Sequence, residues 1–255
     1  MTKSELKKRD WIAGLERGLA ILESFDNQHP RMTATQAAER SGLTLSAARR
    51  YLLTLEHLGY LYSDGRHYGL TPRVLKVGWS YFDSAALPRL LLPFLQRASA
   101  AINESVYVSV LDNHDLVFIA KNGVTRLMTT GFVLGARVPA HLVSPGIAML
   151  AALPEEEIQA RLGSLEFNSF TPHTLLDAGL IHAEIEKARA AGYAVLEQQL
   201  QVGVRGIAVP LKNRSGKVVA AMSVSLPMLN EKKEAAVARV LPVFQEIANT
   251  LISYL

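Results

Sequence analysis

Residues 33–55 read TATQAAERSGLTLSAARRYLLTL, and this stretch predicts two helices joined by a tight turn. Thr33 can cap the first helix, which ends at Ser41-Gly42 because glycine readily adopts the left-handed conformation that closes a helix. Thr44 or Ser46 can cap the second helix. In that helix an apolar stripe recurs at three- and four-residue spacing, formed by Leu45, Ala48, Leu52, Leu55 and Leu58. Two short helices around a glycine turn, with paired arginines early in the second, predict a helix-turn-helix.

The flanking segments extend this unit to a winged helix. Residues 14–25 carry leucine and phenylalanine at helical spacing and predict a helix with one buried face, formed by Leu15, Leu19, Leu22 and Phe25. After the helix pair, residues 60–62 and 66–70 flank an Asp-Gly turn and predict a β-hairpin in the position of a wing. Thr71-Pro72 then begins a further helix that runs to about Ser84 and is the expected domain linker.

The outward face of the second helix is the expected surface for reading DNA. Its residues are Ser46, Ala47, Arg49, Arg50 and Thr54, and the wing tip adds Arg66 and His67. Guanidinium groups pair with guanine O6 and N7 or with phosphate, so the arginines can read bases and anchor the backbone. Alternatively, Ser46 is only a cap and the wing tip only a solvated turn. The charge agrees with DNA, because residues 1–83 hold 12 Lys and Arg against 9 Asp and Glu, and residues 84–255 hold 15 against 14.

The rest of the chain predicts an α+β domain in which helices flank an antiparallel sheet. Strands are expected at residues 105–111, 116–122, 127–132, 193–197, 206–212 and 218–226. Helices are expected at residues 87–103, 144–153, 155–162, 180–191 and 231–254. We therefore expect a winged helix at residues 1–71, a linker helix at 72–85 and a second domain at 86–255.

Composition and missing motifs exclude several classes of function. The 255 residues include no cysteine, which excludes disulfides and thiolate sites and fits a reducing cytoplasm. No secretory signal and no apolar run long enough to span a bilayer is present. No nucleophile elbow, phosphate-binding loop or dinucleotide loop occurs. His141, His173 and His182 lack the short spacing of a zinc site, so neither a metal nor a cofactor is expected.

At this point several segments resemble the IclR family of transcriptional regulators. The DNA-binding half of that family is similar to GLERGLAIL (14–22), SAARRYLLTL (46–55) and PRVLKVG (72–78). Its effector-binding half is similar to LGARVPAH (134–141), FTPHT (170–174), GY (192–193) and GVRGIAVP (203–210). Within the family, DWIAGL (10–15) and AARRY (47–51) are most similar to sensors of 4-hydroxybenzoate and protocatechuate in the β-ketoadipate pathway. The resemblance implies a GAF-like effector domain and a homodimer or dimer of dimers.

The resemblance also implies where a small effector, an aromatic or other small carboxylate, would bind. The implied contacts are Ser144, Pro145, Gly146, Val204, Gly206, Ser223 and Ser225. Ser223 and Ser225 alternate along a strand and so present two hydroxyls to one face. The alternative is that these serines are satisfied polar residues of a sheet. Two positions depart from the family: residues 146–149 read Gly-Ile-Ala-Met, and Leu196 stands where an acidic residue is common, with Glu197 one place later. Leu196 is expected to favour an apolar ring, while Glu197 could receive a hydroxyl.

Two other classes of function remain as alternatives. A hydrolase would use Ser144 or Ser223 with a histidine, although the nucleophile elbow is missing. A sensor whose helix-turn-helix binds protein would lack the salt dependence that phosphate contacts give to DNA binding. The expected function is nevertheless a DNA-binding transcriptional regulator controlled by a small metabolite.

Overall fold

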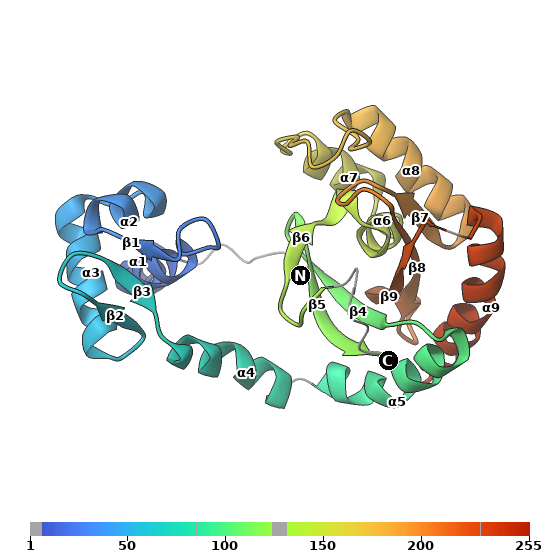
Figure 1. The fold of residues 1–255 in the computed structure, drawn as a ribbon, viewed down its shortest axis with the longest axis horizontal. Coiled ribbons are helices and arrows are strands. Elements are labelled where there is room, and N and C mark those ends of the chain that lie inside the picture. The colour runs from blue at the N-terminus through green and yellow to red at the C-terminus, as the bar shows by residue number, and fades with distance from the viewer. Residues whose placement is uncertain (1–6, 85, 124–131, 230) are drawn as a thin grey trace. The chain divides into compact units, whose positions relative to one another are not determined.

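The computed structural model describes residues 7–84, 86–123, 132–229 and 231–255 (Figure 1). The chain divides into two compact units after Ser84. Across the described ranges, no helix is long and apolar enough to cross a membrane.

The first unit is a three-helix core with a small antiparallel sheet. Its elements are η1 (Lys8–Asp10), α1 (Ala13–Glu23), β1 (Arg31–Met32), α2 (Ala34–Ser41), α3 (Leu45–His57), β2 (Leu61–Ser63), β3 (Tyr68–Leu70), η2 (Pro72–Val74) and α4 (Leu75–Ser84). The strands are ordered β1-β3-β2. The hairpin β2–β3 is the predicted wing, whereas β1 was not predicted because two residues are too short to show an alternating pattern.

Capping fixes the helix-turn-helix as the sequence predicted. The Thr33 hydroxyl and the Gln36 side chain form a reciprocal capping box at the start of α2. Gly42 ends that helix with a φ of 67°. The cap of α3 is Thr44, whose hydroxyl accepts from the Ala47 amide at 3.3 Å, while Ser46 lies within the first turn.

The predicted apolar stripes are only partly buried. In α3 the core residues are Ala48, Leu52 and Leu55, but Leu45 and Leu58 are 52% and 47% exposed. These two leucines stand at the ends of the helix, where the stripe runs past the elements that cover it. In α1 Ile21 is buried and Leu22 is half-buried, and Phe25 is buried just after the helix ends. Leu15 and Leu19 are 62% and 46% exposed, so the predicted burial of these two is wrong for the isolated chain.

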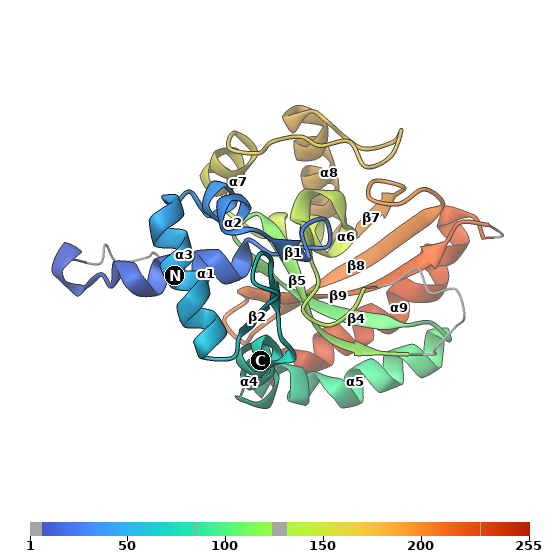
Figure 2. The same cartoon turned by 60° about the vertical axis from the view of Figure 1, so that its left-hand side comes forward.

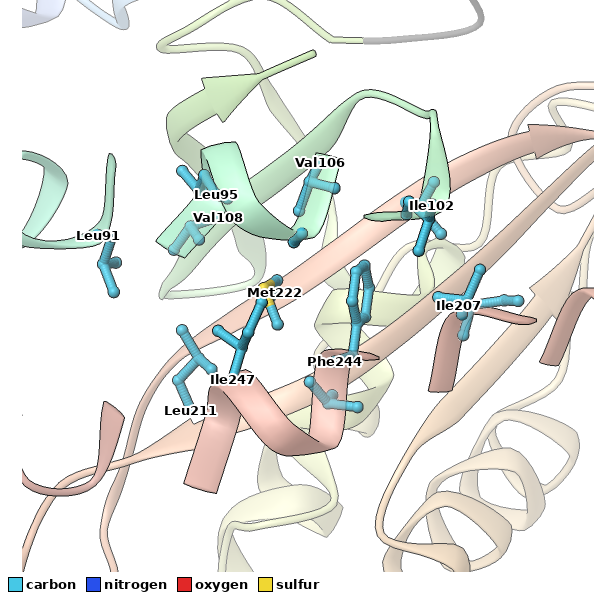
Figure 3. Close-up of a cluster of buried hydrophobic side chains, with 14 of the residues drawn as sticks. Leu91, Leu95, Ile102, Val106, Val108, Ile207, Leu211, Met222, Phe244 and Ile247 are labelled. Atoms are coloured by element: carbon cyan, nitrogen blue, oxygen red, sulfur yellow. The ribbon is translucent and has the colours of Figure 1, made fainter. Parts of the chain in front are cut away.

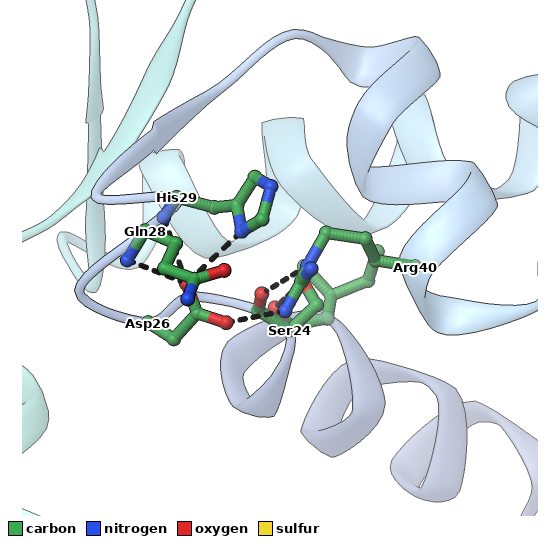
Figure 4. Close-up of polar contacts among 6 residues, drawn as sticks. Ser24, Asp26, Gln28, His29 and Arg40 are labelled. Carbon is green, nitrogen blue, oxygen red and sulfur yellow. Dashed lines mark hydrogen bonds and ion pairs between the residues drawn. The ribbon is translucent and has the colours of Figure 1, made fainter. Parts of the chain in front are cut away.

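A polar cluster joins α1 to α2 and sets the start of the helix-turn-helix (Figure 4). Arg40 donates from Nε to the Ser24 carbonyl at 2.8 Å and from Nη2 to Asp26 Oδ2 at 2.6 Å. The other oxygen of Asp26 accepts from the backbone amides of Gln28 and His29 at 2.9 and 2.7 Å. A single carboxylate therefore orders the loop and ties it to α2.

The second unit is a six-stranded antiparallel sheet with helices on both faces (Figure 2). Its strands are β4 (Val106–Asp112), β5 (Asp115–Asn122), β6 (Arg137–Pro139), β7 (Ala194–Glu197), β8 (Val204–Lys212) and β9 (Val218–Pro227), in the order β6-β5-β4-β9-β8-β7. Its helices are α5 (Ala86–Ile102), η3 (Ala140–Leu142), α6 (Ser144–Leu150), α7 (Glu155–Leu162), α8 (Ala178–Ala191) and α9 (Lys233–Leu251). The α+β class predicted from the sequence is confirmed.

Each face of the sheet carries its own apolar core. On one face α5 and α9 pack against alternate strand residues such as Val108, Ile207 and Met222 (Figure 3). On the other face α6, α7 and α8 cover Tyr107, Leu196 and Ala208 and their neighbours. Successive strand residues therefore belong to different layers, as the two-residue period of a strand requires.

The sheet differs from the sequence prediction at residues 127–132, at β6 and at the turn between β4 and β5. The strand expected at residues 127–132 lies almost wholly outside the described residues, and Phe132 is not in a strand. The strand β6 was not predicted, and its three residues pair with β5. The turn between β4 and β5 is shorter than expected because Asp112 and Asp115 already pair across it. Asn113 occupies the turn with a φ of 54°, a left-handed conformation that asparagine tolerates.

Candidate functional sites

The exposed face of α3 carries the two arginines that the sequence singled out. Arg49 and Arg50 are exposed, and within the described part of the chain neither guanidinium has an ion-pair partner. Ser46 and Thr54 are exposed beside them, and Ala47 is half-buried. The Thr54 hydroxyl donates to the Arg50 carbonyl at 2.8 Å, so its lone pairs remain available as acceptors. This face offers two uncommitted cations on a rigid helix.

The wing tip is ordered by one carboxylate. Asp64 Oδ1 accepts from the backbone amides of His67 and Arg66 at 2.7 and 3.0 Å, and Arg31 pairs with Oδ2. The amide of His67, then that of Arg66, hold the pKa of the Asp64 carboxyl well below its usual range. Arg66 is exposed, whereas His67 is half-buried with Nδ1 3.5 Å from Asp64 Oδ2. Arg66 is therefore the freer of the two predicted wing contacts.

The second unit contains a cavity of about 140 Å³ on the sheet face that α6 covers. Its lining residues are Phe118, Phe132, Leu142, Val143, Ser144, Pro145, Leu196, Gln198, Gln199, Leu200, Gln201, Val204, Gly206, Ser223 and Ser225. None of these side chains carries a charge. The wall is therefore apolar with a set of hydroxyl and amide groups, the usual make-up of a small-molecule site.

Strand register brings the polar groups of this pocket together. Gly206 pairs with Ser225 and Ala208 with Ser223, so both serines face the pocket side of the sheet. A Cβ on residue 206 would lie 2.5 Å from Ser144 Oγ, so only glycine lets Ser144 come this close. Ser144 is 2% exposed, and its hydroxyl has no hydrogen-bond partner among the described residues. A buried hydroxyl of this kind needs a ligand or water to satisfy it.

The structure brings together most of the predicted effector contacts. The pocket is lined by Ser144, Pro145, Leu196, Val204, Gly206, Ser223 and Ser225. Gly146 is not among the lining residues. A Cβ on Gly146 would lie 1.9 Å from the Ala140 carbonyl oxygen, so this glycine serves the close packing of α6 on η3.

Sequence reasoning missed Leu142 and Val143, which precede α6, and two further parts of the pocket wall. Phe118 and Phe132 stack with ring centroids 4.2 Å apart and planes 12° from parallel. Nothing in the spacing of these two residues indicates that they meet. The segment 198–201 directly follows β7 and also lines the pocket. Three glutamines in four residues after a strand were the available signal.

Glu197 does not face the pocket. Its Oε1 accepts from Arg205 Nε at 2.5 Å, and these two residues pair across β7 and β8 on the face opposite Leu196. The possibility that Glu197 receives a hydroxyl of the effector is therefore wrong. Arg137 also lies outside the pocket lining and braces the β4–β5 turn through Asp112 and Asp115 at 2.8 and 3.1 Å.

The other histidines and carboxylates give no catalytic arrangement with the pocket serines. Among the residues that the structure describes, no histidine lines the pocket. Away from the pocket, one group on α7 and α8 could hold a metal ion: ligand atoms of Glu155, His182 and Glu186 lie within 4.8 Å of one another. Arg189 pairs with both carboxylates, at 3.6 Å from Glu155 and more closely with Glu186. This group is thus charge-compensated by a side chain and ties α7 to α8.

A winged helix with free arginines, joined to a domain that encloses a small pocket, defines a ligand-responsive DNA-binding regulator. Known proteins agree. Residues 14–65 match the IclR helix-turn-helix domain, and residues 79–253 match the C-terminal domain of bacterial IclR transcriptional regulators. The chain belongs to the IclR family of transcriptional regulators.

Three individual proteins illustrate how similar the chain is to known proteins. The chain is 34% identical to the Pca operon regulatory protein of Acinetobacter baylyi over 98% of its own length and 91% of that protein. A putative transcriptional regulator of Rhodococcus is 37% identical, with a TM-score of 0.77 over 95% of this chain and 97% of that one. A double mutant of the inducer-binding domain of PobR from Acinetobacter, crystallised with 3-hydroxybenzoic acid, is 27% identical with a TM-score of 0.63 over 67% of this chain and 100% of that one.

Proposed function

We propose that the effector of this regulator is a one-ring aromatic carboxylate, bound in the pocket between α6 and the sheet. The pocket's size and lining carry the proposal. An apolar cavity of about 150 Å³ holds one benzene molecule, and this cavity is about 140 Å³ with Phe118, Leu196 and Val204 in its wall. A double mutant of the PobR domain was crystallised with 3-hydroxybenzoic acid, which supports the same chemistry here.

Neutral donors would hold the carboxylate. Among the described lining residues there is no lysine, arginine or histidine, so in this proposal hydroxyl and amide groups meet the negative charge. Ser144 Oγ is the foremost donor, because it is buried without a partner in the described residues. Ser223 and Ser225 lie on β9 and also line the pocket. A carboxylate accepts several such hydrogen bonds at once, which compensates for its loss of water.

The pocket binds its ligand without converting it. A serine hydrolase activates its nucleophile with an adjacent base, and the described part of the lining includes no such group beside Ser144 or Ser223. The hydrolase alternative is tested with chromogenic esters, for which we expect no turnover above the rate in buffer.

In this proposal the winged helix binds operator DNA through Ser46, Ala47, Arg49, Arg50, Thr54, Arg66 and His67. Two copies of the chain act together, because one winged helix makes few contacts and a dimer reads two half-sites. Leu15 and Leu19 of α1, and Leu75 and Val77 of α4, are exposed apolar residues that the second copy would cover. A protein that binds bacterial operators works in the cytoplasm.

A thermal-shift and calorimetry screen tests the effector class. The panel contains 4-hydroxybenzoate, 3-hydroxybenzoate, protocatechuate, benzoate, a short keto-acid and cyclohexanecarboxylate as the non-aromatic control. A ligand at 100 times its Kd stabilises the fold by about 2.7 kcal/mol. We expect this stabilisation from one or more aromatic acids and not from the control. Binding of the keto-acid alone would contradict the proposal.

A further inference from the structure

We infer that Glu197, Arg205, Glu231 and Arg239 form one bonded chain that fixes the pocket loop to the far end of α5 and so carries the effector's signal toward the linker. This inference rests on the proposed effector function and concerns its regulation. The pocket loop is defined here as residues 198–203, between β7 and β8.

One end of the chain stands at the base of the pocket loop. Glu197 and Arg205 flank that loop and pair across the two strands, with Nε 2.5 Å from Oε1. Four residues of the loop line the pocket, Gln198, Gln199, Leu200 and Gln201. A ligand that contacts these residues acts on a loop whose two ends are joined by this ion pair.

The chain continues on the opposite face of the sheet, where α5 and α9 pack. Arg205 Nη1 donates to the Glu231 carbonyl at 2.9 Å. The Glu231 carboxylate then accepts hydrogen bonds from Nε and Nη2 of Arg239, at 2.9 and 2.7 Å. The remaining nitrogen, Arg239 Nη1, donates to the Ile102 carbonyl at 2.9 Å. Ile102 is the last residue of α5, and α5 begins at Ala86, two residues after the DNA-binding unit ends.

Burial and geometry separate this chain from ordinary surface ion pairs. Arg205 is 4% exposed, so its guanidinium cannot change partners without leaving a buried charge unpaired. The Glu231–Arg239 pair is bidentate, which fixes direction as well as distance. By contrast, Arg97 and Glu246 also join α5 to α9, but through a single 3.1 Å contact with both side chains mostly exposed. That pair is the matched control.

Hydrogen exchange of the whole protein without ligand tests whether the bonded chain of these four residues links the pocket loop to α5. Arg205 itself is left intact because its replacement puts folding at risk. We expect Arg239→Met to speed exchange at the amides of Gln198 and Gly203 at least fivefold, although Arg239 contacts neither residue. From the other end, Glu197→Gln should speed exchange at residues 100–102. Arg97→Met should change neither region. Loop amides that keep the wild-type rate, or that quicken only as much as those of the central strand β4, overturn the inference.

Operator binding supplies the regulatory readout. With 4-hydroxybenzoate at saturation, Arg239→Met should reduce the factor by which this acid changes operator affinity at least threefold, while operator affinity without the acid stays as in wild type. An unchanged factor would overturn the signalling role. If 4-hydroxybenzoate and the rest of the panel fail to bind wild-type protein, the proposed effector function fails. The exchange experiment alone then decides whether the bonded chain links the pocket loop to α5.

Discussion

Single residues set the pocket's shape through what they lack. Gly206 has no Cβ, and this absence lets Ser144 Oγ approach β8 on the pocket side. The same hydroxyl is buried and unpaired among the described residues, so an effector that hydrogen-bonds it would relieve an unfavourable state. A position of this kind is identified from packing and not from residue type, because serine and glycine also occur throughout ordinary turns.

The paired arginines of α3 give the most direct residue-level prediction. Replacing Arg49 or Arg50 by alanine should cost about 1–3 kcal/mol of operator binding if the side chain reads a guanine, with relaxed preference at one base pair. A phosphate contact would instead weaken all sequences alike. The measurement is a salt-controlled titration of operator and scrambled DNA. Arg97→Ala, on α5, is the control and should leave both affinities unchanged. Unaltered operator binding by the Arg49→Ala, Arg50→Ala double variant would exclude α3 as the reading helix.

The pocket serines give a second prediction at this scale. Ser223→Ala and Ser225→Ala should each weaken the effector by about 0.5–1.5 kcal/mol, or by up to about 3 where the partner oxygen is charged. Calorimetry with the acid that binds best measures the loss. Ser164→Ala, at the exposed end of α7, is the matched control. Operator affinity without effector should be the same in all three variants. Full effector affinity in the double serine variant would place the carboxylate elsewhere in the pocket.

At the scale of elements, local sequence signals and burial differ in how well they could be predicted. The capping of α2 and α3, the glycine turn and the wing are local, so Thr33, Gly42 and Thr44 identify them directly. Burial depends on what lies opposite a helix, which spacing does not record, and Leu15 and Leu45 were therefore misplaced. The strands β1 and β6 escaped prediction because two or three residues show no period.

The short helix η3 carries a pH prediction. His141 is 6% exposed, and its Nδ1 has no hydrogen-bond partner in the described residues. Burial, and secondarily the charge of His114, lower the pKa of His141 below its ordinary value. The unfolded chain therefore takes up this proton at higher pH than the folded chain does. As pH falls through the unfolded pKa of about 6.5, the folded state loses stability until the folded pKa is reached.

Unfolding experiments at several pH values check this sign. Between about pH 7.5 and pH 5.5 the free energy of unfolding should fall more steeply for wild type than for His141→Gln. Ser164→Ala, which removes no titrating group from the same unit, is the control and should keep the wild-type slope. Parallel slopes for wild type and His141→Gln would contradict the role assigned to burial.

At the scale of the whole molecule, the order of winged helix, helix and α+β domain could be predicted from the sequence together with most of the pocket. Ser223 and Ser225 share a face because strands alternate, and this followed from sequence alone. The stacked pair Phe118 and Phe132 could not be predicted, because it joins β5 to a segment that reaches it only in the folded chain. The bonded chain could not be predicted either, because its Arg239 lies 137 positions from Ile102, the residue it contacts.

Assembly is the first prediction for the whole molecule. Light scattering at micromolar concentration should report a dimer or a dimer of dimers for wild type. Leu15→Glu with Leu19→Glu should shift the mass toward half of the wild-type value, because each change places a charge on the surface proposed to contact a second copy. Leu229→Glu changes an 86% exposed leucine of the other unit and should leave the mass unchanged. A wild-type monomer, with and without DNA, would remove the dimer from the proposal.

The last prediction concerns the coupling between the two units. If the effector changes operator affinity by some factor, thermodynamic linkage requires operator DNA to change effector affinity by the same factor. Typical coupling free energies of about 1–3 kcal/mol correspond to factors of about 5–150, well within the range of calorimetry. The effector is titrated into the protein with and without saturating operator, and the operator into the protein with and without effector. Equal factors are expected, and Ser223→Ala should weaken effector binding while leaving the factor intact, because it alters affinity for both states alike. A factor of one in both directions, with transcription also unaffected, would mean that this ligand is not the signal and that the pocket serves another molecule.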